Sequence, residues 1–117
     1  MKIAIIGYSG SGKSTLARIL AEKYGVDVLH FDTVQFLPNW EIRNDDEKKR
    51  ITKDFLDTHE SWVIDGNYSK QHFDRRMREA DRIIFMNEGV ILEDGTPDDV
   101  INNPKNERTK AFLSKML

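Results

Sequence analysis

The chain has 117 residues, of which 38% are hydrophobic and 32% charged, and its formal net charge is −2. This length leaves room for one compact domain, and so balanced a charge gives no general attraction to nucleic acid or anionic membranes. Cysteine is absent, which excludes disulfides and thiolate metal sites. Because no apolar run is long enough to span a membrane and Met1 leads directly into a strand-like run, we expect a soluble cytoplasmic protein without a signal peptide.

The strongest pattern stands near the start of the chain, where strand, glycine-rich loop and helix signals follow one another. Residues 2–6 form a short apolar run rich in β-branched side chains, which is typical of a strand buried on both faces. The stretch 7–15, GYSGSGKST, fits the phosphate-binding P-loop pattern G-x-x-x-x-G-K-S/T. The next apolar residues fall at helical spacing: Leu16, Ile19, Leu20 and Tyr24.

This loop has the chemistry of a phosphate cradle. Its glycines let the backbone N–H groups turn toward an anion, and the helix that follows adds the positive end of its dipole. Lys13 is expected to reach the β- and γ-phosphates of ATP, and the Ser14 hydroxyl to bind a Mg²⁺ ion that bridges them. The predicted phosphate-binding residues are Gly7, Ser9, Gly10, Ser11, Gly12, Lys13, Ser14 and Thr15. A chance match in a glycine turn is the alternative, against which the flanking strand and helix argue.

Strand and helix patterns continue to alternate beyond the loop. The predicted elements, in chain order, are a strand at 26–31, a loop at 33–44, a helix within 45–60, a strand at 61–66, a helix containing Phe73, Met77 and Ala80, and a strand at 82–86. Gly25 is predicted to end the first helix, and Ser69 to cap the start of the last helix before residue 82. This alternation predicts an α/β fold of the three-layer P-loop NTPase type, with four core strands in a mainly parallel sheet and helices on both faces.

The pattern changes from residue 87 onward. Glu88-Gly89 indicates a turn, residues 90–93 a short strand, and Thr96 with Asp99 three residues later the capped start of a helix. A last helix is predicted with an apolar side formed by Ala111, Phe112, Leu113, Met116 and Leu117. We expect one domain over 1–117, in which this C-terminal segment adds a strand and helices to the core of residues 1–86.

Two aspartates stand at the C-terminal ends of predicted strands, at the edge of the sheet where ligands of such folds bind. Asp65 ends an apolar strand as a Walker B carboxylate does, where it can hold Mg²⁺ through a water or orient a nucleophile; an ordinary Asp-Gly turn is the alternative. Asp32 occupies the equivalent end of another strand, where it can accept a proton from a substrate hydroxyl or help to position the metal, and capping is the alternative. The candidate catalytic residues are therefore Lys13, Asp32 and Asp65, and the candidate metal ligands Ser14 and Asp65.

Aromatic and basic residues supply candidates for substrate binding. Trp40, with Phe36 nearby, can wall a pocket because an aromatic plane stacks well on a base or a sugar; packing in the core under a long loop is the alternative. Arginines crowd the segment 75–82, and guanidinium groups are natural partners of phosphate. We expect most of them in solvated ion pairs and one or two at most facing the site. The substrate candidates are Asp32, Trp40 and Arg75. The three histidines show no metal-ligand spacing and are expected to be structural.

Four stretches, GYSGSGKST, HFDTVQFLPNW, WVIDGNYS and ADRIIFM, occur in the order in which they stand in the small P-loop kinases called topology modulation proteins. Residues 1–86 resemble this family, which is related to adenylate and shikimate kinases. The resemblance implies binding of ATP and Mg²⁺ and transfer of phosphate to a small acceptor. It also implies Lys13 on the phosphates, Ser14 on the metal, and Asp32 with Asp65 beside the acceptor. It does not identify that acceptor.

The segment from about residue 80 to 117, ADRIIFMNEGVILEDGTPDDVINNPKNERTKAFLSKML, resembles the end of an amino-acid-type ABC transporter ATPase. Kinases of the first family continue instead with an arginine-bearing lid helix, another core strand and a final helix. We infer a chimera, built or natural, of two P-loop proteins. The ABC signature, Q-loop, Walker B strand and switch histidine belong upstream of the resembling part and are missing, so transporter function is not expected.

Three functions stay open at this point. The first is a phosphotransferase of reduced efficiency, because the lid that excludes water and brings arginines to the transferring phosphoryl group is missing. The second is a nucleotide- or phosphate-binding module without turnover, and the third is a slow ATP hydrolase with an open site. The expected partners are a nucleotide and a small-molecule phosphate acceptor, without direct binding of nucleic acid or membrane. The acceptor and the oligomeric state do not follow from the sequence.

Overall fold

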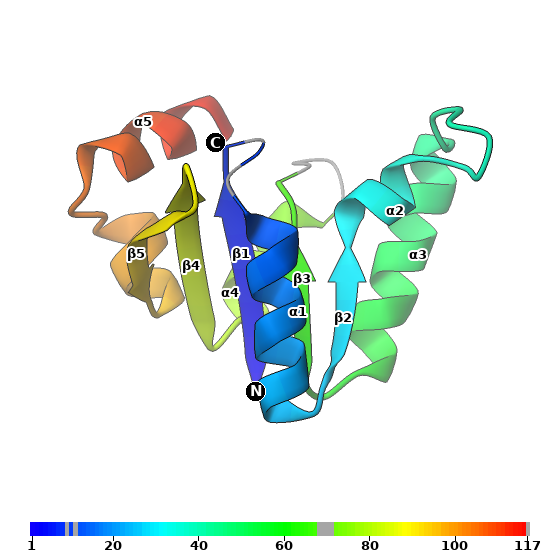
Figure 1. Cartoon of the computed structure of the whole chain (residues 1–117), viewed down its shortest axis with the longest axis horizontal. Helices are drawn as coiled ribbons and strands as arrows, with labels where there is room; N and C mark the ends of the chain where they lie inside the picture. Colours follow the sequence, from blue (N-terminus) through cyan, green and yellow to red (C-terminus); the bar gives the residue numbers. More distant parts are fainter. Residues whose placement is uncertain (9, 11, 68–71, 117) are drawn as a thin grey trace.

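Five strands form one sheet in the order β2-β3-β1-β4-β5 (Figure 1). The computed structural model describes residues 1–8, 10, 12–67 and 72–116. The strands are β1 (Lys2–Gly7), β2 (Asp27–His30), β3 (Trp62–Asp65), β4 (Arg82–Asn87) and β5 (Val90–Gly95). β1 pairs in parallel with β3 and β4, β2 pairs in parallel with β3, and β5 runs antiparallel to β4. The predicted mainly parallel sheet with four core strands and a short C-terminal strand is confirmed.

Helices cover both faces of the sheet, as the three-layer α/β prediction requires. The helices are α1 (Lys13–Tyr24), α2 (Phe31–Gln35), α3 (Asp45–Thr58), α4 (Phe73–Glu79), the π-helical turn η1 (Asp98–Asn102) and α5 (Glu107–Met116). Figure 1 shows α1 in front of the sheet and α4 behind it. Side chains alternate along β1, so that Ile3 and Ile5 pack with Leu20 of α1, whereas Ala4 and Ile6 join the larger core on the other face.

The second predicted strand and the loop after it are corrected by the structure. The strand predicted at 26–31 ends at His30, and α2 occupies the beginning of the loop predicted at 33–44. Phe31 is fully buried at the start of α2, where its ring lies 4.2 Å from the Arg76 guanidinium carbon. The ring packs against a residue 45 positions further along the chain, and the backbone changes from strand to helix at Phe31. Local propensity does not reveal such a distant contact.

The buried face of α1 and the ends of α1 and α4 agree only in part with the sequence pattern. α1 buries Ala17, Leu20 and Ala21, whereas Ile19, which shares the apolar spacing of this helix, keeps 56% of its surface exposed. Gly25 ends α1 as predicted, in the left-handed conformation and with its N–H directed at two carbonyls of the last turn. The predicted N-cap Ser69 lies outside the described residues, and α4 begins only after His72, whose φ of 55° is also left-handed.

Local rules account well for the C-terminal segment. Glu88 and Gly89 form the hairpin turn between β4 and β5 with φ angles of 50° and 76°. The predicted capping arrangement is confirmed, because the Asp99 N–H donates to Thr96 Oγ1 at 3.2 Å and the Thr96 N–H donates to Asp99 Oδ2 at 3.3 Å. The turn that follows is π-helical and buries Val100.

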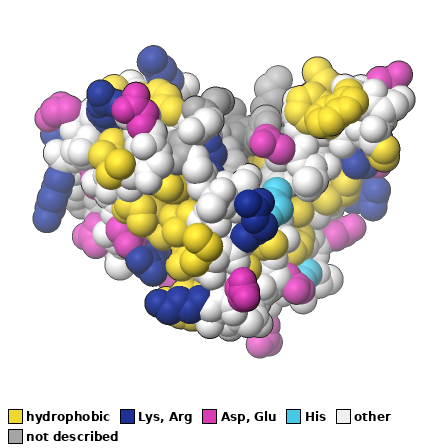
Figure 2. Space-filling view, viewed as in Figure 1, with side chains coloured by type: hydrophobic (Ala, Val, Ile, Leu, Met, Phe, Trp, Pro, Cys, Tyr) yellow, Lys and Arg dark blue, Asp and Glu magenta, His cyan; other side chains and the backbone are white. Residues whose placement is uncertain are grey.

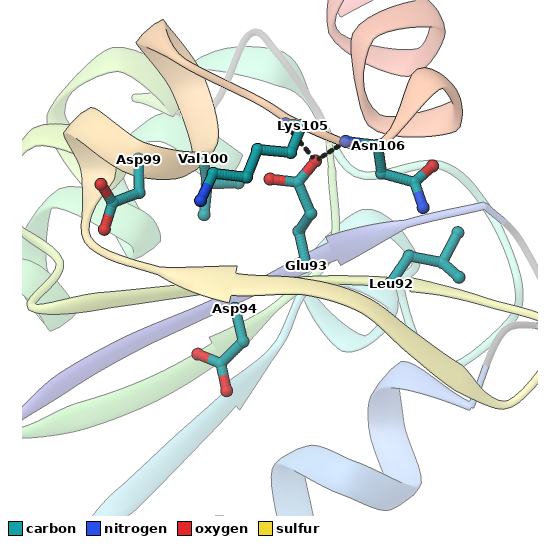
Figure 3. A pocket seen from close by; sticks show the side chains of 7 residues that line it. All are labelled: Leu92, Glu93, Asp94, Asp99, Val100, Lys105 and Asn106. Atoms are coloured by element: carbon teal, nitrogen blue, oxygen red, sulfur yellow. Dashed lines mark hydrogen bonds between the residues drawn. The ribbon is translucent and has the colours of Figure 1, made fainter.

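A carboxylate on β5 fixes the entry into α5. Glu93 Oε1 accepts the backbone N–H of Lys105 at 3.0 Å and that of Asn106 at 2.6 Å, as the dashed lines in Figure 3 show. These bonds satisfy donors of the linker before the helix, and α5 then inserts Phe112 and Leu113 into the larger core. Ala111, predicted on the same apolar side, is exposed.

Apolar side chains reach the surface on the α1 side of β4 and β5. Figure 2 shows them gathered between β5 and α1. Large apolar residues that stay exposed on α1 and β5 include Ile19, Val90 and Ile91, which keep 56%, 54% and 44% of their surface. None of the described helices combines the length and the apolar character needed to cross a membrane.

Candidate nucleotide site

The P-loop begins at a residue that only glycine can occupy. Gly7 ends β1 with a φ of 149°, and a Cβ atom there would stand 2.1 Å from the carbonyl oxygen of Met86 on β4. Gly12, with a φ of 90°, precedes α1, and its carbonyl accepts the Leu16 N–H at 3.1 Å. Ser9 and Ser11 lie outside the described residues, so the described part of the loop is Gly7, Tyr8, Gly10, Gly12 and the first turn of α1.

Lys13 bridges the two ends of this loop. Its Nζ donates to the carbonyl of Gly7 at 3.1 Å and to that of Tyr8 at 2.9 Å. Burial lowers the pKa of the Lys13 ammonium below its ordinary value of 10.5, and the negative charges of Asp65 and Asp32 oppose that shift. The three predicted catalytic residues therefore lie within electrostatic reach of one another.

Asp65 is buried at the end of β3, with 3% of its surface exposed. Burial raises the pKa of its carboxyl above the ordinary 3.8, while the hydrogen bond to His30 acts in the opposite direction. Asp65 Oδ2 bonds His30 Nδ1, and the two residues are directly paired in the β2–β3 register. His30 thus contacts a candidate site residue. Spacing along the chain does not reveal this contact, because it depends on the pairing of two strand ends.

Asn67 is a second residue that the motif does not reveal. Its Oδ1 accepts the Gly7 N–H at 3.0 Å, and its Nδ2 donates to the Gly7 carbonyl at 2.7 Å. The pair of bonds resembles a rung of a β-ladder, made by a side-chain amide just beyond the end of β3. The first residue of the P-loop is thereby bound on its β3 side by Asn67 and covered on its β4 side by Met86.

Arg76 supports Asn67 from α4. Its side chain is fully buried, and its guanidinium carbon lies 4.2 Å from the ring centroid of Phe31 and 5.3 Å from that of Phe73. Nη1 donates to the Gly66 carbonyl at 3.1 Å and Nη2 to that of Asn67 at 2.6 Å. Burial lowers the pKa of Arg76 to about 9. Arg76 therefore fixes the backbone of Gly66 and Asn67, and the Asn67 side chain in turn bonds the first residue of the P-loop.

The other arginines of this segment form ion pairs, as expected from the sequence. Arg75 pairs with Glu79 and with Asp57, and Glu79 also bonds Lys2 at the start of β1. The P-loop follows the opposite end of that strand, so the structure does not bring Arg75 together with Lys13 and Asp65. Arg78 and Arg82 pair with acidic residues in the same way.

A hollow of about 600 Å³ opens beside Asp32, next to the carboxyl end of β2. Asp32, Phe36, Pro38, Trp40 and Arg43 form part of its wall. Trp40 is 80% exposed and has a φ of 65°, a conformation rarely adopted by bulky residues. The alternative that Trp40 packs in the core is therefore wrong, whereas the expectation that it walls a pocket agrees with its position.

A second hollow, of about 530 Å³, lies beside β5 and has Glu93, Asp94, Asp99 and Lys105 among its lining residues (Figure 3). Its carboxylates have partners within the fold. Glu93 bonds the linker before α5, Asp94 pairs with Arg82, and Asp99 caps η1. This hollow is therefore explained by the docking of the C-terminal segment.

The donor set at the end of β1 and β3 fits a nucleotide with Mg²⁺. Lys13 can turn from two carbonyls to phosphate oxygens, and a hydroxyl at Ser14 together with the Asp65 carboxylate offers the hard oxygen ligands that Mg²⁺ prefers. Over the described residues no three His, Cys, Asp or Glu side chains gather as a metal site. Phosphate oxygens and waters would accordingly complete the coordination of the ion.

Comparison with known proteins agrees with this geometry. The family model described as "AAA domain" matches residues 3–97, most of the chain. The chain belongs to the AAA-domain family. The match spans β1, the P-loop and β5, and the AAA domain is a P-loop NTPase domain with the α/β sheet seen here.

Parts of this AAA domain are also similar to curated transport proteins. Over 38 residues, 32% of the chain, it is 55% identical to the arginine transport ATP-binding protein ArgV of Corynebacterium glutamicum and to the glutamine transport ATP-binding protein GlnQ of Geobacillus stearothermophilus, covering 15% and 16% of them. Over 109 residues, 93% of the chain, it is 30% identical to the arginine transport ATP-binding protein ArtM of Bacillus subtilis and covers 43% of that protein. The AAA domain thus spans less than half the length of these relatives.

Proposed function

We propose that this AAA domain binds ATP with Mg²⁺ and transfers the γ-phosphoryl group to a nucleotide or another small acceptor. The observation that carries the proposal is the convergence of Lys13, Asp65 and Asp32 at one edge of the sheet, beside a hollow of about 600 Å³ that has Asp32 and Trp40 in its wall. The resemblance of residues 1–86 to the topology modulation kinases supports the same reaction type. The acceptor class follows from the aromatic wall, which suits a base or a sugar.

Each group has a separate task in this proposal. The backbone N–H groups of the loop and the start of α1 bind phosphate, and Lys13 neutralises the charge of the β- and γ-phosphates. Ser14 and Asp65 would hold the Mg²⁺, which when bound lowers the repulsion between phosphate and attacking oxygen. Asp32, exposed in the wall of the hollow, accepts the proton of the acceptor hydroxyl. Gly10, Gly12 and Thr15 complete the cradle, and Ser9 and Ser11 belong to it by their place in the motif.

The C-terminal segment limits the expected rate. Kinases of the resembling family carry a lid helix with arginines after the fourth strand, whereas this chain continues with a hairpin into β5. Without that lid helix, water has easier access to the transferring phosphoryl group, and fewer cations stabilise its developing charge. We therefore propose reduced efficiency, with slow ATP hydrolysis or nucleotide binding without turnover as the alternative functions.

The two relatives that match over only 38 residues support a mixed ancestry. The 38 residues matched in both equal in length the segment 80–117, in which the sequence resembles the end of amino-acid-type ABC ATPases. We propose that the chain is a chimera that folds as one domain, with a kinase-like core at 1–86. A role in transport is not proposed, because the sequence lacks the ABC signature and the switch histidine.

The proposal is tested by a phosphoryl-transfer screen with ATP labelled at the γ-phosphate. Nucleotides, sugars and shikimate-like alcohols serve as acceptors, and Lys13→Ala is the control for activity that does not use the loop. Label in an acceptor supports the kinase, and release of free phosphate alone replaces it with the hydrolase. ATP binding without labelled acceptor or free phosphate supports a nucleotide-binding module without turnover. The absence of ATP binding contradicts all three functions.

A further inference from the structure

A histidine at the end of β2 contacts the carboxylate that is a candidate metal ligand. Asp65, the last residue of β3, keeps 3% of its surface exposed, and its Oδ2 bonds His30 Nδ1. Because an ionised carboxylate only accepts hydrogen bonds, this bond places an imidazole proton on Nδ1. The carboxylate cannot rotate about its Cβ–Cγ bond without breaking the contact, and the contact does not use its other oxygen, Oδ1.

The imidazole stands on a backbone that is held on both sides. His30 is the last residue of β2 and is paired with Asp65 in the parallel register of β2 and β3. Its carbonyl accepts the Thr33 hydroxyl at 2.6 Å, and the next residue, Phe31, is fully buried. The position of Nδ1 is therefore set by the sheet and by the first turn of α2.

The backbone on the carboxylate side is equally constrained. The Gly66 N–H donates to the Ile5 carbonyl at 3.0 Å, and Arg76 donates to the Gly66 carbonyl at 3.1 Å. A Cβ atom at Gly66 would stand 2.6 Å from Phe31 Cβ, so the peptide after Asp65 has little room to shift. With this backbone held, the freedom that remains to Asp65 is rotation of its side chain, and the bond to His30 restrains that rotation.

We propose that His30 is a positioning residue that holds the Asp65 carboxylate ready for Mg²⁺. Without the imidazole the carboxylate can turn, and the ion must then fix it at a cost in side-chain entropy. Removing the hydrogen-bond partner of a metal ligand typically costs about 10–100-fold in metal affinity. The inference rests on the proposed binding of ATP with Mg²⁺ and assigns His30 no contact with the nucleotide or the ion.

Two titrations of each variant separate this role from general support of the loop. One uses ATP with excess Mg²⁺, and the other uses ATP in a chelating buffer without divalent ions. For His30→Ala we expect the affinity for MgATP to fall about tenfold or more, and the affinity for metal-free ATP to change less than about twofold. A residue that only supported the phosphate cradle would change both affinities alike.

A matched pair of substitutions tests the hydrogen bond itself. Asparagine places its Nδ2 donor where the imidazole has Nδ1, so His30→Asn should keep the MgATP affinity within about threefold of the wild type. Leucine has the same shape as asparagine without the donor, and His30→Leu should show the full loss. Thermal melting confirms that each variant folds, and this pair serves if His30→Ala does not.

The chain offers a control at the opposite edge of the sheet. His59 Nε2 bonds Asp27 Oδ2 at 2.9 Å, and Asp27 begins the strand that His30 ends. His59→Ala removes this second histidine–aspartate pair and should leave both ATP affinities unchanged.

Contrary outcomes fall into two groups. Equal losses for MgATP and metal-free ATP, an unchanged or higher MgATP affinity, or equal losses in His30→Asn and His30→Leu overturn the inference while nucleotide binding stands. A wild-type chain that binds ATP equally well with and without Mg²⁺ overturns the metal site and the inference with it. A wild-type chain that binds neither form of ATP overturns the proposed function itself.

Discussion

The two ends of the sheet bury different kinds of side chain. Around β1, β2 and β3 the buried side chains include the charged residues Asp65 and Arg76. Burial raises the pKa of Asp65 and lowers that of Arg76, and both shifts favour the neutral form. Around β4 and β5 the inserted groups are mostly apolar, with Thr109 as a buried polar exception, and the carboxylates of that segment cap turns or pair at the surface. The first end also holds the candidate nucleotide site. Its buried charges cost stability, and the apolar core at the second end offsets that cost.

The largest expected effect is the loss of folding when residues 87–117 are removed. Val100, Phe112 and Leu113 then leave the larger core, and at about 1.5–3 kcal/mol per buried side chain their loss approaches the whole stability of about 5–15 kcal/mol of a small domain. Calorimetric melting should show no cooperative transition. A cooperative transition in the truncated protein would show that residues 1–86 fold without the C-terminal segment.

Single substitutions within residues 87–117 should also lower stability, by an amount that depends on how deeply each side chain is buried. The Phe112 ring lies 5.3 Å from that of Tyr8 and 5.1 Å from that of Phe85, so Phe112→Ala should cost about 3–5 kcal/mol of unfolding free energy. Ile91, 44% exposed on β5, is the control, and Ile91→Ala should cost less than about 1 kcal/mol. Denaturant unfolding measures both.

Lys13→Ala should separate binding from stability. We expect it to remove most MgATP binding, a loss of about 100-fold or more, because the ammonium is the cation of the cradle. The free energy of unfolding should not fall in proportion, since burial already disfavours the charged lysine. Isothermal titration gives the affinity and denaturant unfolding the stability. Unchanged affinity would contradict the assignment of the cradle.

Much of this architecture can be predicted from the sequence because it depends on residues that are close together in the chain. The P-loop, the Gly25 cap and the Thr96–Asp99 capping pair each involve residues close in the chain, and the apolar runs give the strands. The layered fold follows from their alternation. The hairpin into β5 is equally local, since Glu88-Gly89 is a turn signal between two apolar runs.

The supporting contacts of the site could not be predicted in this way. His30 and Asp65 are 35 residues apart, and Gly7 and Asn67 are 60 apart, so both contacts depend on which strands become neighbours. Arg76 stands beside three other arginines of the segment 75–82, and only tertiary packing selects it for burial. Such contacts have no periodic signature, because one residue on each element is enough to make them.

Asp65→Asn tests the cost of the buried carboxylate. Burial raises the pKa of the Asp65 carboxyl in the folded state above the ordinary 3.8. At pH values between 3.8 and this raised pKa, the folded state binds more protons than the unfolded state. The free energy of unfolding therefore falls as the pH rises through that window. Asparagine carries no such penalty. The variant should gain on the order of 1 kcal/mol above the window and nothing below pH 3.8, while its Mg²⁺-dependent ATP binding weakens. Melting over a pH series measures the gain, and an equal gain at every pH would remove the ionisation as its cause.

The smallest expected effect concerns a polar group at the second end of the sheet. Thr109 on α5 is fully buried, and its Oγ1 makes no hydrogen bond within the described part of the chain. Thr109→Val keeps the shape and removes an unpaired hydroxyl, so it should raise the unfolding free energy by about 1 kcal/mol. Thr52 is the matched control, because it is as deeply buried but its Oγ1 donates to the Lys48 carbonyl at 2.9 Å. Thr52→Val loses that bond and should be neutral or destabilising in the same denaturant series. If both valine variants shift stability alike, the hydroxyl of Thr109 is as well satisfied as that of Thr52, and the second end of the sheet carries no polar cost.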